Sequence, residues 1–399
     1  MSWNRIEDLD FAEKVALVRV DANVPMQEGK VTDETRLVRI KPTVDALANL
    51  GARSVLLSHF GRPKDAPDPA FSLEPIVPAL SKALDRAVHF APDCIGDVAQ
   101  KAVEDLQPGG VLLLENTRFH PGEKTNDPEF SASLSRLGDI FVSDAFSSAH
   151  RAHASVTGIA EHLPSCAGRA LEAELTALDA ALGSPAHPVI AVVGGAKVST
   201  KLALLENLIA PTDAIIIGGG MANTFLAAKG YQIGQSLYEP DLIEKAKEIG
   251  AAAEAASCDL LLPLDVVVAE AFAENAPHAV YRADRCPATG MILDAGPETI
   301  NALKLRLQTV KTVIWNGPLG AFEVAPFDAA TNAVAQEVAN LTAAGRMTSV
   351  AGGGDTVAAL NQSGAAADFT YISTAGGAFL EWMEGKTLPG VAALMGERG

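Results

Sequence analysis

The chain has 399 residues, 48% of them hydrophobic, so it can bury the cores of two or three domains. It holds 31 Lys and Arg against 49 Asp and Glu, and the net charge of −18 argues against general binding to nucleic acid or anionic membranes. The four cysteines lie far apart without a CxxC pair, which argues against a disulfide framework or a cysteine zinc site and for reduced thiols.

The N-terminal segment gives no sign of a targeting signal. It reads "MSWNRIEDLD", with early acidic residues and without the apolar stretch of a signal peptide. No apolar run approaches the roughly 18 residues that a membrane span needs. We therefore expect a soluble, cytoplasmic protein.

Short aliphatic and β-branched runs alternate with longer segments of helical period, such as residues 241–256. This alternation predicts an α/β fold with parallel sheets covered by helices on both faces, that is, doubly wound and Rossmann-like. In the first part of the chain, strands are predicted at residues 15–21, 54–59, 111–116 and 140–145. In the second part they are predicted at 189–195, 214–220, 260–269, 312–317, 348–354 and 371–377.

One segment predicts the boundary between two such domains. Four leucines of residues 168–188 share a helical stripe, which ends at a Gly-Ser-Pro sequence. Because a series of strands precedes and another follows it, we interpret 169–184 as a connecting helix. It would join a first domain at 1–168 to a second at 185–377.

Basic residues follow the strands of the first part, and the carboxyl ends of parallel strands meet at one edge of a sheet. The residues of interest after these strands are Asp21, Asn23, Arg36, His59, Arg62, Arg118, His120, His150, Arg151 and His153. A guanidinium group can donate two parallel hydrogen bonds to two oxygens of a carboxylate or phosphate, so the set predicts a site for a small polyanion. Asp21 and Asn23 would accept hydrogen bonds from a hydroxyl group of this ligand. The alternative is a set of ordinary ion pairs, with Asp21 holding an arginine. A metal site at His150 and His153 is less favoured, since Arg151 lies between them.

Glycines follow the strands of the second part instead, at 194–195, 218–220 and 352–354, with a further glycine-rich turn at 316–323. Such turns bring backbone N–H groups and helix N-termini to one place, which suits phosphate binding. Lys197 and Lys201 would share one face of a helix that begins after Gly195 and would reach a phosphate chain. The alternative is a solvated pair of lysines.

Two acidic residues complete the predicted phosphate site. Asp355 could hold Mg²⁺ beside nucleotide phosphates, although an N-cap is its commonest role before a helix. Glu323 could accept from ribose hydroxyls. The sequence contains no P-loop motif and no G-x-G-x-x-G, which excludes P-loop NTPases and counts against a Rossmann oxidoreductase.

Taken together, eight motifs resemble those of the phosphoglycerate kinase family, in order, from about residue 15 to 383. They are "RVDANVP", "SHFGRP", "LLENTRFH", "SDAFSSAHRAHAS", "GGAKVSTK", "IIIGGGMANTF", "WNGPLGAFE" and "AGGGDT". The resemblance implies reversible transfer of the acyl phosphate of 1,3-bisphosphoglycerate to MgADP, which gives 3-phosphoglycerate and ATP in glycolysis and gluconeogenesis.

The resemblance also implies roles for individual residues. The 3-phosphoglycerate site would consist of Asp21, Asn23, Arg36, His59, Arg62, Arg118 and Arg151, with Arg36 also catalytic. Lys197 would follow the transferring phosphoryl group, and Lys201 would contact the α-phosphate. Glu323 would bind ribose. The loop of Gly353, Gly354, Asp355 and Thr356 would hold the phosphates, with Asp355 as the Mg²⁺ ligand.

The family further implies a monomer whose two domains close on a hinge, here the connecting helix and the segment near 371–377. Its C-terminal tail, residues 378–399, would pack back on the first domain. The chain departs from the usual family pattern at Ala22, Ser147, Ser148 and Ala375, and we expect none of these residues to touch a charged site residue. The alternative to an enzyme is a protein that binds nucleotide or sugar phosphate without catalysing a reaction. This alternative is disfavoured because the chain has a charged residue at every position where the family pattern requires one.

Overall fold

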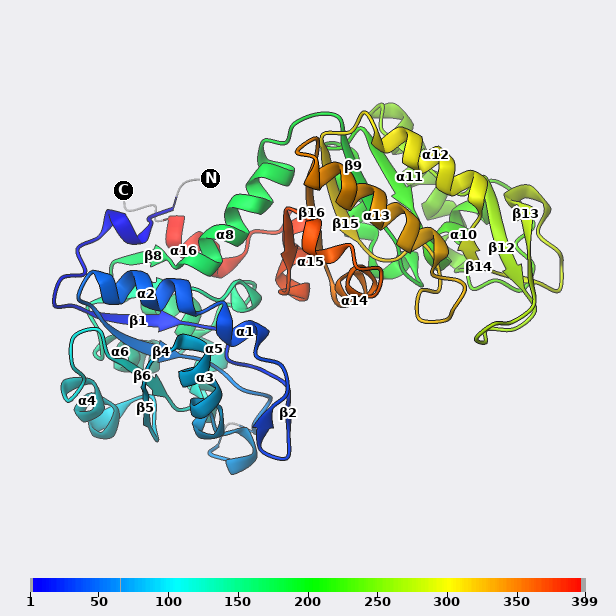
Figure 1. Cartoon of the computed structure of the whole chain (residues 1–399). Helices are drawn as coiled ribbons and strands as arrows, with labels where there is room; N and C mark the ends of the chain where they lie inside the picture. Colours follow the sequence, from blue (N-terminus) through cyan, green and yellow to red (C-terminus); the bar gives the residue numbers. More distant parts are fainter. Residues whose placement is uncertain (1–2, 65, 396–399) are drawn as a thin grey trace. The chain divides into compact units, whose positions relative to one another are not determined.

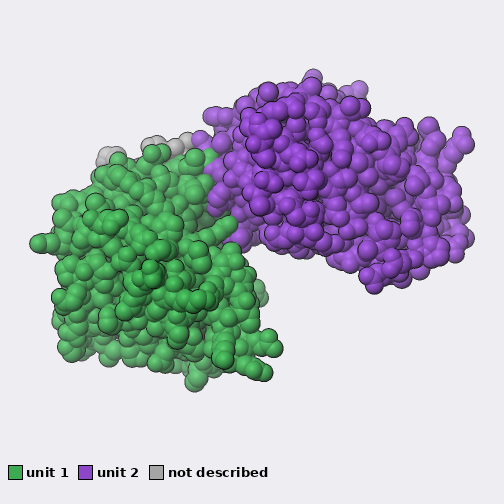
Figure 2. All heavy atoms as spheres, viewed as in Figure 1, with its two compact units in different colours: residues 1–176, 387–399 green, residues 177–386 purple. Residues whose placement is uncertain are grey.

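The computed structural model describes residues 3–64 and 66–395 and consists of two compact units (Figure 1). The first unit comprises residues 1–176 and 387–399, and the second comprises residues 177–386 (Figure 2). Each unit is built around its own six-stranded sheet, and all strand pairs within these two sheets are parallel. The predicted α/β fold with two doubly wound parallel sheets is therefore confirmed.

The sheet of the first unit has the strand order β5-β6-β4-β1-β7-β8. Its strands are β1 (Val15–Arg19), β4 (Arg53–Leu57), β5 (Val88–Ala91), β6 (Val111–Leu114), β7 (Ile140–Ser143) and β8 (Ser165–Ala167). A short hairpin of β2 (Met26–Gln27) and β3 (Lys30–Val31) follows β1. Strands β5 and β8 were not among the predicted strands, because each is short and its sequence lacks a continuous apolar run.

Helices cover both faces of this sheet. They are α1 (Thr35–Val38), α2 (Lys41–Asn49), α3 (Val77–Leu84), α4 (Gly96–Glu104), α5 (Gly122–Thr125), α6 (Pro128–Ser135) and α7 (Ile159–His162). Successive strand side chains point to opposite faces, so Val18 packs with α2 and α3 while Leu17 packs with α4 and α6. Both faces are therefore buried, which explains the uninterrupted apolar strands.

The sheet of the second unit has the order β11-β10-β9-β15-β16-β17, the 3-2-1-4-5-6 arrangement of dinucleotide-binding folds. Its strands are β9 (Val189–Val193), β10 (Ala214–Ile217), β11 (Asp259–Leu261), β15 (Thr312–Asn316), β16 (Thr348–Gly352) and β17 (Tyr371–Ser373). Its helices are α9 (Leu202–Ile209), α10 (Gly219–Ala228), α11 (Ile243–Ala255), α12 (Pro297–Leu307), α13 (Ala329–Ala343), α14 (Gly354–Gln362) and α15 (Gly376–Met383). The strand order reverses between β9 and β15, which is where such folds bind ligands.

The second unit also contains an antiparallel sheet that the sequence analysis missed. Strand β12 (Asp265–Ala269) lies between β13 (His278–Arg282) and β14 (Met291–Ala295). The single strand predicted at 260–269 is thus wrong: Pro263 separates β11 from β12, and the two belong to different sheets. The residues of β13 are exposed and lack the apolar pattern that would have predicted a strand.

The connecting helix and the tail differ from their predicted bounds. Helix α8 (Arg169–Leu178) continues as a π-helical turn at Asp179–Gly183, and the two units meet in sequence between residues 176 and 177. The tail returns to the first unit from residue 387, not from 378, because α15 packs against α9. Helix α16 (Pro389–Met395) packs against α7 and β8, and Gly390 N donates to Ala149 O. Residues 396–399 of the predicted tail lie outside the described residues.

Asp144, just after β7, caps helix α8 from within the first unit. Its Oδ1 accepts hydrogen bonds from Ala170 N (2.8 Å) and Leu171 N (3.2 Å). Burial raises the pKa of this carboxyl to about 7. A Cβ on Gly168 would lie 2.3 Å from Asp144 Oδ1, so only glycine fits there.

We expect Asp144→Asn to make unfolding less dependent on pH. The raised pKa means that the folded state binds more protons than the unfolded chain between about pH 4 and 7, so stability is lost as the pH rises through that range. Asparagine keeps the capping oxygen and removes the buried charge. The difference in free energy of unfolding between the variant and the wild type should therefore be about 2 kcal/mol more favourable to the variant at pH 8 than at pH 5. Urea unfolding at both pH values measures this, with Asp127→Asn at the N-cap of α6 as control. Equal pH dependence in wild type and Asp144→Asn would contradict it.

Candidate active site

In the first unit, the predicted residues come together where the strands end. Arg36 on α1 forms an ion pair with Asp21 (Nη1–Oδ2, 3.2 Å) and donates to Asn23 O (2.8 Å). Ser147 Oγ, beyond β7, donates to Asp21 Oδ2 (2.5 Å). Gly61 N donates to Asn23 Oδ1 (3.0 Å). Asp21 thus holds an arginine, as in the alternative interpretation. The expectation that no departure from the family pattern touches a charged site residue is wrong for Ser147, because its short hydroxyl side chain reaches Asp21 from the segment after β7.

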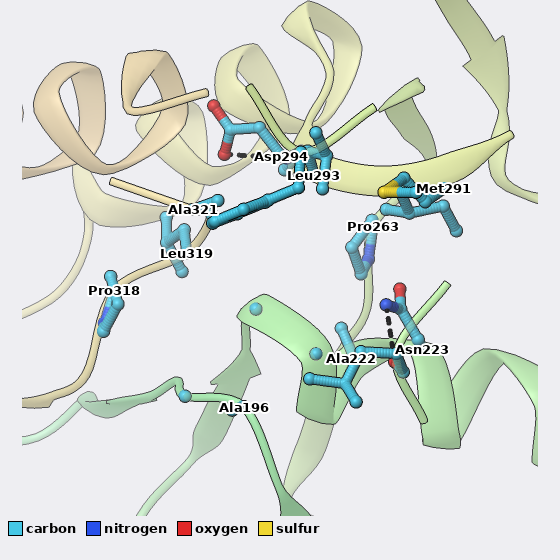
Figure 3. A pocket seen from close by; sticks show the side chains of 18 of the residues that line it. Ala196, Ala222, Asn223, Pro263, Met291, Leu293, Asp294, Pro318, Leu319 and Ala321 are labelled. Carbon is cyan, nitrogen blue, oxygen red and sulfur yellow. Dashed lines mark hydrogen bonds between the residues drawn. The ribbon is translucent and has the colours of Figure 1, made fainter. Parts of the chain in front are cut away.

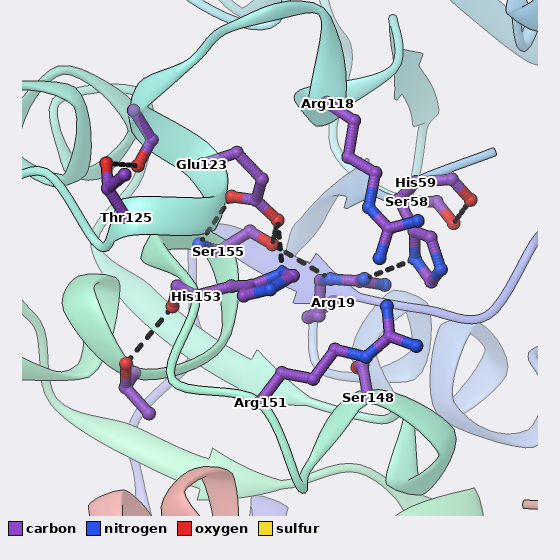
Figure 4. Close-up of polar contacts among 12 residues, drawn as sticks. Arg19, Ser58, His59, Arg118, Glu123, Thr125, Ser148, Arg151, His153 and Ser155 are labelled. Carbon is purple, nitrogen blue, oxygen red and sulfur yellow. Dashed lines mark hydrogen bonds and ion pairs between the residues drawn. The ribbon is translucent and has the colours of Figure 1, made fainter. Parts of the chain in front are cut away.

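A second group of basic residues surrounds Arg118, which lies on the 3-10 turn Thr117–Phe119 after β6 (Figure 4). Arg118 Nη1 donates to Gly61 O (2.7 Å), while its buried Nε has no hydrogen-bond partner among the described residues. Burial, together with nearby Arg151 and Arg19, lowers the pKa of Arg118 to about 10. Positive charges gathered at such density favour an anionic ligand.

Three residues that the sequence analysis did not single out hold this group in place. Arg19, at the end of β1, is fully buried, and its Nε donates to Ser155 Oγ (3.0 Å). Ser155 Oγ in turn donates to the buried carboxylate of Glu123 (2.6 Å), which also lies 3.7 Å from His153 Nδ1. The sequence did contain a sign that Arg19 is buried, because it is the one charged residue of an otherwise apolar strand.

Three of the singled-out basic residues have other surroundings. His120 Nε2 lies 2.7 Å from Asp93 Oδ1, and its ring stacks on Phe130. Arg62 is exposed, yet close enough to contribute to the lowered pKa of Arg118. His150 Nε2 accepts from Arg151 Nε (3.2 Å), an arrangement that does not favour a metal ion there.

In the second unit, a cavity of about 550 Å³ lies beside the predicted glycine turns (Figure 3). Apolar side chains form much of its lining, among them Ala222, Met291 and Leu293, and Glu323 and Asp355 also line it. Gly195 and Gly219 belong to the same lining. An apolar cavity with a few polar groups at its edge is the usual form of a small-molecule site.

The glycine turns are packed backbone to backbone. A Cβ on Gly194 would lie 1.8 Å from Pro318 O, and one on Gly317 would lie 2.1 Å from Gly194 O. Gly219, with φ of +65°, would bring a Cβ to 2.7 Å from Gly195 O. The close approach of three loops after β9, β10 and β15 therefore requires these glycines, in addition to any ligand.

Lys201 joins two of these loops at the point where the strand order reverses. Its Nζ donates to Gly194 O (2.6 Å), to Asn316 O (2.9 Å) and to Asn316 Oδ1 (2.5 Å). Burial lowers the pKa of Lys201 to about 8, and Asp355 acts in the opposite direction. A partly buried ammonium at this position supplies positive charge next to the cavity.

The prediction that Lys197 and Lys201 share one helix face is wrong. Lys197 has an extended backbone and precedes the 3-10 turn Val198–Thr200, and α9 begins only at Leu202. Lys197 is exposed, whereas Lys201 points into the protein. Glu239 fixes the turn between them by accepting from Ser199 N (2.9 Å) and Ser199 Oγ (2.5 Å).

The triple-glycine loop ends β16 and begins α14. Gly353 has φ of +100° and is the N-cap of α14, so Asp355 lies within the first turn instead of capping it. Thr356 Oγ1 accepts from Gly317 N (2.7 Å) and thereby ties α14 to the loop after β15. Gly354 and Asp355 are exposed, and a Cβ on Gly354 would meet no described atom within 4 Å.

Comparison with known proteins shows the family of the chain. The model of the family described as phosphoglycerate kinase matches residues 6–386. The chain belongs to the phosphoglycerate kinase family. The prediction of a phosphotransferase of this family is therefore confirmed.

Individual members of the phosphoglycerate kinase family match over nearly the whole chain. The phosphoglycerate kinase of Cereibacter sphaeroides (strain ATCC 17025) is 62% identical, with 99% of this chain and all of that protein covered. The phosphoglycerate kinase of Ruegeria pomeroyi is 60% identical, with 99% of each covered. The solved structure of phosphoglycerate kinase from Coxiella burnetii has a TM-score of 0.92 at 41% identity and covers 99% of each chain.

The described part of the chain contains no helix that is both long and apolar enough to cross a membrane.

Two glycine replacements should distinguish a glycine that the packing of the loops requires from one that only leaves room for a ligand. Gly194→Ala should destabilise the protein by about 3 kcal/mol, because its Cβ would overlap the Pro318 carbonyl. Gly354→Ala should leave stability within about 0.5 kcal/mol, since the position is open, yet raise the KM for nucleotide if phosphates approach this loop. Thermal unfolding and steady-state kinetics measure both, and equal stability of the two variants would contradict the packing argument.

Proposed function

We propose that the protein transfers the acyl phosphate of 1,3-bisphosphoglycerate to MgADP, reversibly, and that the first unit binds the triose phosphate and the second the nucleotide. The observation that carries this assignment is the contrast between the two sets of strand ends. Arginines gather at one of them. An apolar cavity, glycine turns and Lys201 gather at the other.

In the first unit, Arg36, Arg118 and Arg151 would bind the carboxylate and phosphate of the triose, since guanidinium forks match both groups. The unpaired Nε of Arg118 supports this role, because a buried donor without a partner is costly unless a ligand accepts from it. Asn23 and His59 would add hydrogen bonds, and the exposed Arg62 would attract the anion.

In the second unit, the apolar lining would hold the base, and Glu323 would accept from the ribose. The N-terminus of α14, with Gly353, Gly354 and Thr356, would face the phosphates. Lys201, whose three donors are directed at Gly194 and Asn316, would add positive charge beside them and would contact the α-phosphate only by exchanging one of these partners. Asp355 suits Mg²⁺, since an exposed carboxylate beside phosphates is the ligand that this ion prefers. Bound Mg²⁺ would neutralise charge on the nucleotide phosphates.

The chemistry needs positive charge more than a base. The carboxylate of 3-phosphoglycerate is the leaving group when ATP forms and the acceptor in the reverse direction. It is ionised at neutral pH, so neither direction requires a base to remove a proton from it. What limits the reaction is the meeting of two polyanions and the charge on the equatorial oxygens of the moving phosphoryl group. Arg36 and the exposed Lys197 would supply that stabilisation, one from each unit.

A direct assay tests the proposal. Purified protein with MgATP should form ADP only when 3-phosphoglycerate is present. Hydrolysis of ATP without 3-phosphoglycerate, or calorimetric binding of both substrates without turnover, would contradict it, and the second result would indicate a binding protein. Scattering that is unchanged by both substrates would contradict the predicted closure of the two units. The monomeric state and the cytoplasmic location stay predictions.

A further inference from the structure

His59 lies at the end of β4 in the first unit, and its hydrogen bond to Arg19 defines its protonation. Arg19 Nη2 is 2.8 Å from His59 Nδ1. A guanidinium group can only donate, so Nδ1 must accept and carries no proton. The one proton of a neutral imidazole then resides on Nε2.

Arg19 is held so firmly that it imposes this arrangement. Its Nε donates to Ser155 Oγ (3.0 Å), and Nη1 donates to the carbonyl of Val20. Ser155 is fixed in turn by two hydrogen bonds to the buried carboxylate of Glu123. Three donors of the guanidinium are therefore directed at three different acceptors, and the third of these is His59 (Figure 4).

The charges around His59 act in the same direction. The ring is buried, and the titratable groups that face it are Arg19 from β1, Arg118 from the turn after β6, and Arg151 and His153 from the segment after β7. All of them are basic. Burial first, and then these neighbours, hold the pKa of His59 well below its usual range.

We propose that Arg19 is a positioning residue that keeps His59 neutral with its proton on Nε2. His59 then offers the triose phosphate one N–H donor and no positive charge, while the charge of the site comes from its arginines. Among the described residues Nε2 has no hydrogen-bond partner, so this donor is available to a ligand. That second step rests on the proposed function, whereas the tautomer rests on the contacts of this chain alone.

Nitrogen NMR of the wild-type protein with ¹⁵N-labelled histidine tests the tautomer directly. We expect a pyrrole-type Nε2 and a pyridine-type Nδ1 for His59, unchanged from pH 8 to 5.5. The variant His59→Gln assigns the signals. A proton on Nδ1, or a doubly protonated ring at pH 7, would overturn the proposal.

A paired replacement tests whether Arg19 is responsible. Arg19→Met combined with Glu123→Gln removes the two buried charges together, so neither is left unpaired. We expect His59 to bind a proton at least tenfold more tightly in this variant and to lose its single tautomer. Unchanged His59 signals in the folded variant would overturn the role of Arg19. If the variant does not fold, Ser155→Ala, which removes one anchor of Arg19, should change the signals in the same direction, and unchanged signals there would again overturn the role.

Adding 3-phosphoglycerate separates this inference from the proposed function. A shift of the Nε2–H signal, with the ring still neutral, would support both. If calorimetry shows that 3-phosphoglycerate binds but the Nε2–H signal of His59 does not shift, the inference that this N–H donates to the ligand is overturned. No binding at all would contradict the proposed function and leave the tautomer as the wild-type spectra give it.

Discussion

Lys197→Ala should lower kcat by roughly 10³-fold, because a cation that follows the moving phosphoryl group acts mainly on the transition state. The replacement should not disturb folding. Lys197 is exposed, and no described residue forms an ion pair with its ammonium, while the turn that carries it is held by the Glu239–Ser199 hydrogen bonds. The KM for nucleotide should change little, since the positive charge of the partly buried Lys201 is retained.

Steady-state rates with 3-phosphoglycerate and MgATP measure this effect. Lys311→Ala, at an exposed lysine of the same unit, is the matched control and should keep the wild-type rate. Lys197→Arg should recover part of the activity, because it restores the charge at a different length. A loss of less than tenfold in Lys197→Ala would mean that this ammonium does not contact the reacting phosphoryl group.

Arg36→Ala should cost on the order of 3 kcal/mol of transition-state stabilisation, comparable to the loss of one oxyanion-hole donor, which is about 150-fold in kcat/KM. Arg36 is half-buried, and its Nη1 group is oriented by Asp21 and Asn23 O. The remaining guanidinium donors are therefore available to a ligand in a fixed direction.

The kinetic pattern distinguishes this role from a structural one. The KM for MgATP should stay near the wild-type value, since Arg36 belongs to the first unit. Arg136→Ala, an exposed arginine at the end of α6, serves as the control for loss of charge. A change below tenfold in turnover would remove Arg36 from the catalytic set.

The strands were predictable where a buried parallel strand leaves a continuous apolar run. Strands β1 and β9 begin at the predicted residues, and both are fully buried. The exposed β13 left no such pattern, and one apolar run concealed the break between β11 and β12. Local sequence reports burial of a segment, but it does not report which sheet the segment joins.

The candidate site was predictable to the extent that it follows from the ends of strands. Asp21 follows β1 and pairs with Arg36 of α1, which lies only 15 residues later in the chain. Arg19 and Glu123 were not found, because a buried charge resembles a surface charge when only its own segment is read. The prediction that Lys197 and Lys201 share a helix face is wrong because the helix begins after both residues, at Leu202.

The sequence by itself determined the alternation of helices and strands, the division into two α/β parts and the motifs of the phosphoglycerate kinase family, because these depend on local periodicity and on residue types near one another. Only the tertiary structure decided which side chains form hydrogen bonds or ion pairs with one another. Arg19 and Ser155 are 136 residues apart, and Lys201 and Asn316 are 115 apart. Such pairs form because parallel strands bring distant segments to one edge, where burial strengthens each contact and selects its partner.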